Sequence, residues 1–317
     1  MLYPISEPIP DSVENLFGYI DIRGNVVIQP SYLACSHFSE GKASVVDETK
    51  NAGFIDFSGR LVIPHQFGGL GAFHNGLCSM SGGYIDHSGR WVIPPTFLVA
   101  GSFLEGRAIA SLNGEDMGYI DFSGEFAVPP RFNRCSQFSE GLAAVCIDGC
   151  WGFIDRAGKL EIPTVFEGPT PKGFRDGIAG TRIDGYWGFI DRSGSFLIEP
   201  QYEEIRPFSE GRASVKRDGK WGMIDIGGRL VVECQFDELG ALNAGMAPAQ
   251  LEGKAGFVSA AGEWLIEPKF DSCLRFFREL AVVKVGKTYS YIQRDGRTVW
   301  TSQPGASLQY PPPPPFV

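Results

Sequence analysis

Short hydrophobic runs alternate along the chain with turns rich in Gly, Asp, Ser and Pro, and the pattern repeats. Its clearest part is the phrase Gly-aromatic-Ile-Asp-x-x-Gly. The phrase, decayed in some copies, begins at Gly18, Gly53, Gly83, Gly118, Gly152, Gly188, Gly222, Gly256 and Ser290. Successive copies start 30 to 36 residues apart. This period, held over almost the whole chain, predicts a repeat architecture in which each unit buries its apolar side against the next.

One unit, represented by residues 187–222, contains three runs with the character of strands. The run 187–191 is rich in aromatic and β-branched residues, the run 195–198 follows the turn Asp-Arg-Ser-Gly, and the run 212–215 alternates small and apolar residues. The unit therefore predicts a three-stranded antiparallel meander. Helical periodicity is absent, so the predicted fold class is all-β, with about eight units of about 34 residues.

The aspartate of the phrase is predicted to build a turn. An Asp that opens a type I turn accepts backbone N–H groups further along, and the Gly three residues later supplies the positive φ that closes the hairpin. A row of catalytic or calcium-binding carboxylates would need further acidic neighbours, which are missing. The residues predicted to have this structural role are Asp21, Asp56, Asp86, Asp121, Asp155, Asp191 and Asp225.

Two aromatic positions recur in each unit at constant phase and are predicted to form the core between neighbouring units. The first lies eight residues after the turn Gly, as Tyr202 does after Gly194, and Phe208 is an example of the second. Core packing explains such ladders better than a platform for stacking a ligand. A proline ends the preceding strand in most units, because it removes a donor from the ladder.

Repeats of this kind either close into a propeller-like ring or stack as an open β-solenoid. A ring removes the exposed sheet edges that an open array must cap. Decay of the last two phrases favours a capped open array, whereas the final hairpin could pair with the start of the chain. We favour the propeller-like closed ring. The predicted domains are an N-terminal extension at 1–17, the β-repeat domain at 18–301, and a flexible Pro-rich tail at 302–317.

Charge and composition narrow the classes of partner. The net charge of −9 and the scattering of the 28 Lys and Arg residues argue against a nucleic-acid surface. The chain has no apolar stretch long enough for a membrane span and no signal-peptide pattern at its start, so we expect a cytoplasmic protein. Seven cysteines fit reduced thiols better than a disulfide framework. Cys146 and Cys150 flank a turn, where a disulfide is the alternative to two free thiols.

No constellation typical of catalysis is visible. The four histidines lie at different phases of three units, without zinc or nucleophile spacing, and no phosphate-cradling or dinucleotide motif is present. We expect no cofactor, no metal site and no catalytic residue. Function is then expected on residues that break the pattern. The pattern is broken on the second strand of three units by the tryptophans Trp91, Trp264 and Trp300. These side chains either form an exposed stripe that binds a ligand or are larger side chains at a half-buried position.

The leading hypothesis is a non-enzymatic scaffold that binds a protein or peptide partner on its repeat surface. The first alternative is a carbohydrate-binding module that uses exposed tryptophans. The second is an enzyme with a site in the centre of the ring or in a groove. The segment 310–316, which contains five consecutive prolines, is interpreted either as a polyproline II ligand for an aromatic groove or as a disordered extension.

The phrase Lys220-Trp221-Gly222-Met-Ile-Asp, its variants at Trp187 and Trp151, and the later Phe-Ser-Glu-Gly-x-Ala-x-Val resemble the bacterial WG-containing repeat family. The resemblance covers residues 18–301. Other units depart from it, because Phe17, Ala52, Gly82, Met117 and Ala255 replace the tryptophan. The resemblance implies a β-structured repeat domain without a general enzymatic activity, and it gives no catalytic residues to carry over.

Overall fold

The computed structural model describes residues 1–9 and 15–306, and their regular secondary structure consists of β-strands, as predicted. These strands form nine antiparallel sheets, and the chain divides into two compact units. Unit 1 contains residues 1–102 and the residues from 276 onwards, and unit 2 contains residues 103–275. The predicted Pro-rich tail lies mostly outside the described residues.

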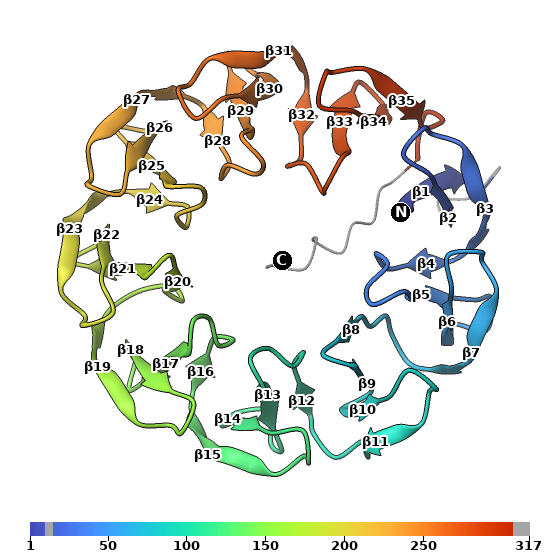
Figure 1. Ribbon diagram of the computed structural model, residues 1–317, viewed down its shortest axis with the longest axis horizontal. Coiled ribbons are helices and arrows are strands. Elements are labelled where there is room, and N and C mark those ends of the chain that lie inside the picture. Colours follow the sequence, from blue (N-terminus) through green and yellow to red (C-terminus); the bar gives the residue numbers. More distant parts are fainter. Residues whose placement is uncertain (10–14, 307–317) are drawn as a thin grey trace. The chain divides into compact units, whose positions relative to one another are not determined.

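The strands of unit 1 come from both ends of the chain (Figure 1). The sheet of β1 (Tyr3–Pro8), β2 (Asn15–Ile20) and β3 (Val26–Tyr32) is followed by β4 (Ala34–Cys35), β5 (Ala43–Val46), β6 (Ala52–Ile55) and β7 (Leu61–Phe67). The next sheet has β8 (Phe73–His74), β9 (Leu77–Met80), β10 (Gly83–Ile85) and β11 (Trp91–Ile93), and β12 (Val99–Ala100) follows it. The last strands are β33 (Ala281–Val285), β34 (Thr288–Ile292) and β35 (Thr298–Thr301).

Unit 2 begins with β13 (Ala108–Ser111), β14 (Met117–Ile120) and β15 (Phe126–Phe132). Its next two sheets contain β16 (Arg134–Cys135), β17 (Leu142–Ile147), β18 (Cys150–Asp155) and β19 (Leu160–Phe166), then β20 (Lys172–Arg175), β21 (Ile178–Ile183), β22 (Tyr186–Ile190) and β23 (Phe196–Tyr202). The remaining strands are β24 (Glu204–Ile205), β25 (Arg212–Arg217), β26 (Lys220–Asp225), β27 (Leu230–Phe236), β28 (Glu238–Leu239), β29 (Ala247–Leu251), β30 (Lys254–Val258), β31 (Trp264–Phe270) and β32 (Ser272–Cys273).

The complete sheets have one strand more than the three-stranded meander predicted from the sequence. The extra strand comes first in each sheet and is only two residues long in β4, β16, β24 and β28. Two residues cannot show an alternating pattern, which is why the sequence does not reveal this strand. In unit 2 the sheets follow one another along an arc, with the short first strands on its concave side and the long last strands on its convex side (Figure 1).

The first glycine of the repeated phrase lies where two strands approach closely, not in the turn. In the sheet of β22 and β23, a Cβ atom built on Gly188 would lie 2.6 Å from the carbonyl oxygen of Ile198. The register shifts at this point, between the pairs Trp187–Tyr202 and Phe189–Ile198. Any larger residue would push the strands apart, so the glycine is required by packing.

The aspartates of the phrase hold the hairpin turns. Asp191 Oδ1 accepts the backbone N–H of Ser193 at 2.8 Å and of Ser195 at 3.1 Å, and Gly194 has a φ of 86°. The hydroxyl of Ser193 also donates to this carboxylate, which lowers the pKa of Asp191. The bond from the N–H two residues further on recurs at Asp21, Asp56, Asp86, Asp121, Asp155 and Asp225.

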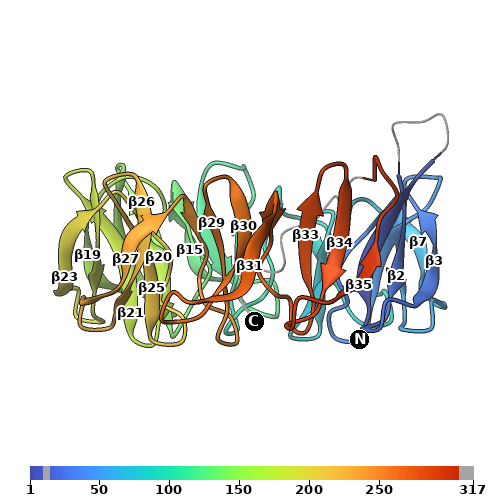
Figure 2. The same cartoon turned by 90° about the horizontal axis from the view of Figure 1, so that it is seen from above.

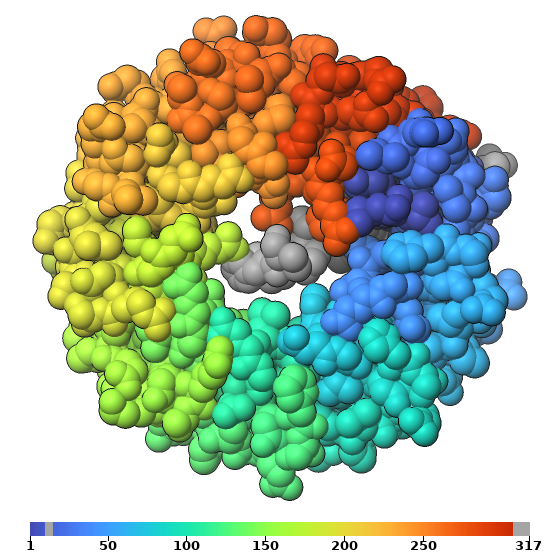
Figure 3. Space-filling view, viewed as in Figure 1, coloured from blue at the N-terminus to red at the C-terminus, as the bar shows by residue number. Residues whose placement is uncertain are grey.

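The first and last sheets pack on each other in unit 1. Tyr3 and Ile5 of β1 share a buried cluster with Tyr291 of β34, and the Tyr291 hydroxyl donates to the carbonyl of Pro4 at 2.7 Å. Figure 2 shows β33, β34 and β35 beside β2 and β3, and Figure 3 shows the corresponding red and blue residues in contact. An open solenoid would separate its first and last repeats, so the propeller-like arrangement is confirmed.

The repeat domain begins earlier than residue 18, which the sequence analysis gave as its boundary. Strand β1 lies within the predicted N-terminal extension and pairs with β2 from Tyr3–Ile20 to Pro8–Asn15. The segment is short and carries two prolines, so its hydrophobic pattern does not match that of the corresponding strands in other units. The first sheet thus consists of three strands, all from the N-terminal end of the chain.

His37 lies near the contact between the first and last parts of the chain. Its burial leads us to expect that the folded protein is less stable in acid. Its ring is buried against Phe277, with 4.6 Å between ring centroids, and burial lowers the pKa of His37 to about 4. The unfolded chain takes up a proton near pH 6.5, whereas the folded chain does so only near pH 4. We therefore expect the free energy of unfolding to fall by about 3 kcal/mol as the pH drops between these values.

Urea unfolding at a series of pH values measures this effect, with His37→Phe as the comparison, because phenylalanine keeps a ring at the position and cannot be protonated. The variant should show a flatter dependence of unfolding free energy on pH between 6.5 and 4. Equal slopes for the two proteins would contradict the assignment of the acid sensitivity to His37.

Candidate functional site

Buried tryptophans occupy one register position in three successive sheets of unit 2. Trp151, Trp187 and Trp221 lie opposite the last strand of their sheets, at Phe166, Tyr202 and Phe236. Their side chains are 1 to 5% exposed. Trp221 also shares a buried cluster with Leu239 of β28, so it lies in the core between its own sheet and the next.

A cationic side chain covers each of these indoles from the concave side of unit 2. The guanidinium of Arg134 lies 5.3 Å from the ring centroid of Trp151, and that of Arg206 lies 4.6 Å from Trp221. The ammonium of Lys172 lies 5.5 Å from Trp187. Such contacts stabilise the ring and the charge together. Each sheet therefore carries one indole–cation pair at its inner edge.

The sheet of β28 to β31 lacks both members of this pair. Ala255 takes the register position of the tryptophan, opposite Phe270, and Gly240 takes the position that Arg206 has in the preceding sheet. A cavity of about 290 Å³ lies at this place. Its wall includes Gly240, Gln250, Ala255, Ser272 and Cys273. The cavity lies where an indole stands in the three preceding sheets, and we call it the Ala255 pocket.

The Ala255 pocket combines an apolar floor with a polar rim. Leu239, Pro248 and Ala249 supply the apolar part, and Arg206 and Glu238 supply two opposite charges. These two charges lie 3.8 Å apart between Nη2 and Oε2. Burial raises the pKa of the Cys273 thiol to about 12, so this group stays protonated at neutral pH. The pocket is suited to hold an apolar group beside a cation, with no reactive nucleophile in its wall.

Further cations lie on the same concave side of unit 2. Lys172 is half-buried, and burial together with the neighbouring Arg206 lowers its pKa. Arg175 is also half-buried, and burial and the charge of Arg275 lower its pKa. Like charges near one another favour the binding of an anion, although Glu204 and Asp176 act in the opposite sense on Lys172 and Arg175. We call the surface formed by β16, β20, β24, β28, β32 and the residues directly after them the inner-strand face.

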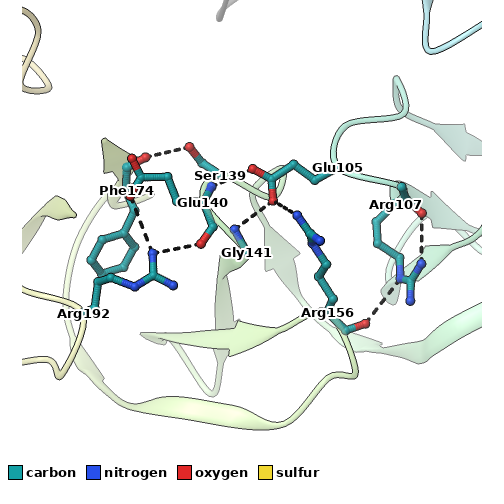
Figure 4. A network of polar contacts seen from close by, with 9 residues as sticks. Glu105, Arg107, Ser139, Glu140, Gly141, Arg156, Phe174 and Arg192 are labelled. Atoms are coloured by element: carbon teal, nitrogen blue, oxygen red, sulfur yellow. Dashed lines mark hydrogen bonds and ion pairs between the residues drawn. The ribbon is translucent and has the colours of Figure 1, made fainter. Parts of the chain in front are cut away.

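A network of glutamates and arginines in unit 2 has the appearance of an active site, but it connects sheets (Figure 4). The carboxylate of Glu105 accepts the backbone N–H groups of Glu140 and Gly141 at 2.7 and 2.8 Å, and it accepts Arg156 Nη2 at 2.7 Å. Burial opposes ionisation of Glu105, but these bonds prevail and lower its pKa. Glu140 in turn accepts the N–H of Gly177 in the following sheet at 3.0 Å.

The same connection recurs elsewhere along the chain. Glu40 accepts the N–H of Gly76 in unit 1, and Glu210 accepts those of Ala244 and Gly245 in unit 2. These glutamates have φ values near 50°, a conformation that costs free energy for a residue with a Cβ atom. Each of these carboxylates accepts backbone amides of a following sheet, so the network stabilises the repeat stack.

The three tryptophans singled out from the sequence lie on separate sheets. Trp91 packs on Phe67 and Trp264 packs on Phe236 of the preceding sheet, each with 5.6 Å between ring centroids. Trp300 packs on Tyr291 of its own sheet. Within unit 1, two other sheets separate Trp91 on β11 from Trp300 on β35, so these two do not form a stripe. Carbohydrate binding by these residues stays a prediction.

Cysteine and histidine side chains add no reactive centre in the part of the chain that the structure describes. All seven cysteines are free thiols, and the partners across the β17–β18 hairpin are Cys146 with Trp151 and Cys150 with Ile147. Within residues 1–9 and 15–306, no three His, Cys, Asp or Glu side chains gather in a group that could hold a metal ion. The same residues contain no helix of the length and hydropathy that a membrane span requires.

Comparison with solved structures finds similar folds at low sequence identity. A structure described as a eukaryotic initiation factor is 10% identical, with a TM-score of 0.60 over 95% of this chain and 96% of that chain. The computationally designed Ika8 protein is 15% identical, with a TM-score of 0.50 over 86% of both chains. Identities this low show similarity of fold alone. A search of curated proteins gives no match.

A sequence profile described as the WG containing repeat matches eight successive segments of the chain. The matched residues are 17–48, 53–80, 83–115, 117–149, 151–187, 187–221, 221–254 and 256–289. The matches cover most of the chain, and their spacing follows the sheets described above. The chain therefore belongs to the family of WG-containing repeat proteins.

Proposed function

We propose that this chain is a non-enzymatic scaffold that binds an acidic segment of a partner protein along the inner-strand face of unit 2. The observation that carries the proposal is that Lys172, Arg175, Arg206 and Arg275 stand on or just after β20, β24 and β32, on one face of a chain whose net charge is −9. Charge complementarity steers an acidic segment to this face and away from the rest of the surface. The repeat fold supplies the rigid support that such a face needs.

A peptide fits this face better than a nucleic acid does. Glu204 and Glu238 stand on β24 and β28 among the cations, where they would repel successive phosphates. A peptide can place its few carboxylates beside Lys172 and Arg275 and its backbone polar groups beside the glutamates. We also propose a cytoplasmic location, and the seven free thiols support it.

Selection of random dodecapeptides on the immobilised full chain tests the proposed function. Enriched peptides should be acidic, and their affinity should fall about tenfold for the double variant Lys172→Met, Arg275→Gln. Methionine keeps an apolar stem over Trp187, so the sheet should retain its packing. The matched control is Lys50→Met, Lys287→Gln, which changes the net charge equally at two exposed turns of unit 1.

Equal binding of the enriched peptides to the double variant and to the wild type would overturn the proposal. It would also fail if no sequence is enriched above an empty support, or if an unrelated oligonucleotide competes as well as free peptide. Thermal unfolding of both variants establishes that they are folded before affinities are compared.

A further inference from the structure

We infer that the Ala255 pocket is a binding site for an aromatic side chain, best an indole, supplied by the bound partner segment. The inference rests on the proposed function and gives its binding face a specific anchor point. It follows from the repeats themselves, because they show which group fits the space. At the same place in the three preceding sheets the chain provides that group itself, as Trp151, Trp187 and Trp221.

The residues around the pocket correspond one by one to those around Trp221. Gln250 lies opposite Ala255, as Lys216 lies opposite Trp221. Cys273 of β32 lines the pocket at the position that Leu239 of β28 has in the buried cluster of Trp221. The positions that surround an indole in one sheet are therefore present in the next, where the indole and the cation that covers it are both missing.

The size and chemistry of the pocket match a side chain and not a large cofactor. Its volume of about 290 Å³ is at the lower end of the range of roughly 300–1,000 Å³ found for small-molecule sites. Leu239, Pro248 and Ala249 offer apolar contact to a ring. Arg206 also lines the pocket, and it already covers the ring of Trp221. A second ring in the pocket would meet the same guanidinium.

The position of the pocket also links it to the cations of the inner-strand face. Arg206 belongs to both features, because it lowers the pKa of Lys172 and lines the pocket. A segment lying on this face can therefore place an aromatic residue in the pocket and an acidic residue beside Lys172. A buried aromatic anchor surrounded by polar contacts is the usual arrangement of a binding hot spot.

Indole itself is the first probe, and N-acetyl-tryptophanamide is the second. In methyl NMR spectra of the full chain, either probe should shift the methyl signals of Ala255 and Leu239, because a bound ring lies over them. In Ala255→Trp the chain fills its own pocket, so the affinity for indole should fall about tenfold or more. The control Leu98→Trp adds a tryptophan at an exposed position of unit 1 and should bind indole as the wild type does.

The peptides selected for the proposed function provide a second, independent readout. Replacing their aromatic residue with alanine should weaken binding to the wild type but not to Ala255→Trp. The inference is overturned if indole leaves the Ala255 and Leu239 methyl signals unchanged, or if Ala255→Trp binds indole as tightly as the wild type. In that case acidic peptides that depend on Lys172 and Arg275 would still support the proposed function, so the two failures are distinguishable.

Discussion

Replacing Trp221 with alanine is expected to lower the free energy of unfolding by about 3–5 kcal/mol. The indole is 1% exposed and fills the space between β26 and the first strand of the next sheet, so its removal leaves a cavity that the neighbouring strands cannot close. The contact with the guanidinium of Arg206 is lost as well. Urea unfolding followed by circular dichroism measures the change through the transition midpoint and slope.

Two further substitutions separate the contribution of packing from that of the indole N–H group. Trp221→Phe keeps a ring under Arg206 and should cost about 1 kcal/mol, since the Nε1 of Trp221 has no hydrogen-bond partner among the described residues. Ala255→Trp restores the Lys-Trp-Gly sequence in the sheet with the cavity and should leave the stability unchanged or raise it. A loss below about 1 kcal/mol for Trp221→Ala would show that the indole does not hold the two sheets together.

Replacing Tyr3 with alanine is expected to produce a loss of similar size at the other end of the chain, about 3–5 kcal/mol. Tyr3 is 1% exposed and packs on Tyr291 and Phe277, with 5.8 and 6.5 Å between ring centroids. These rings join the first sheet to the last. Their loss should also increase hydrogen exchange in β1 and β34, because local opening then requires less free energy.

The matched control is Tyr186→Ala, the same substitution at a side chain that is 50% exposed in unit 2. It should change the unfolding free energy by no more than about 0.5 kcal/mol. If Tyr3→Ala and Tyr186→Ala are equally mild, the packing of the first sheet on the last contributes little to stability, and β1 would be an accessory strand.

The sheets and their core were predictable because their chemistry repeats. The aromatic that follows each strand end and the Asp and Gly of each turn recur at fixed distances, and a structural reason exists for each of them. Tyr202 and Phe208, one from each aromatic ladder, are buried in the same cluster, as the ladders predict. Residue types that recur at the same position of every unit reflect an environment that all units share, and the environment shared here is the buried core.

The features that were not predicted depend on single residues in one unit or on very short segments. Strand β24 has two residues and β1 has an atypical sequence, so neither produces a periodic signal. The sequence identifies Ala255 as a departure from the tryptophan position, but it does not show that this departure opens a cavity. Its consequence depends on Gly240 and Cys273, which are distant in sequence, and only the structure brings the three residues to one cavity.

The glutamates that connect successive sheets have a consequence for how such a chain can evolve. Glu105, Glu140 and Glu210 bind backbone amides, and every residue other than proline offers one. At these contacts a sheet binds the main chain of the next and not a particular side chain. Gene duplication can insert a copy between two existing sheets without breaking these hydrogen bonds, and each copy can then change its exposed residues independently. The Ala255 pocket is an example of a site that one copy can acquire by such a change.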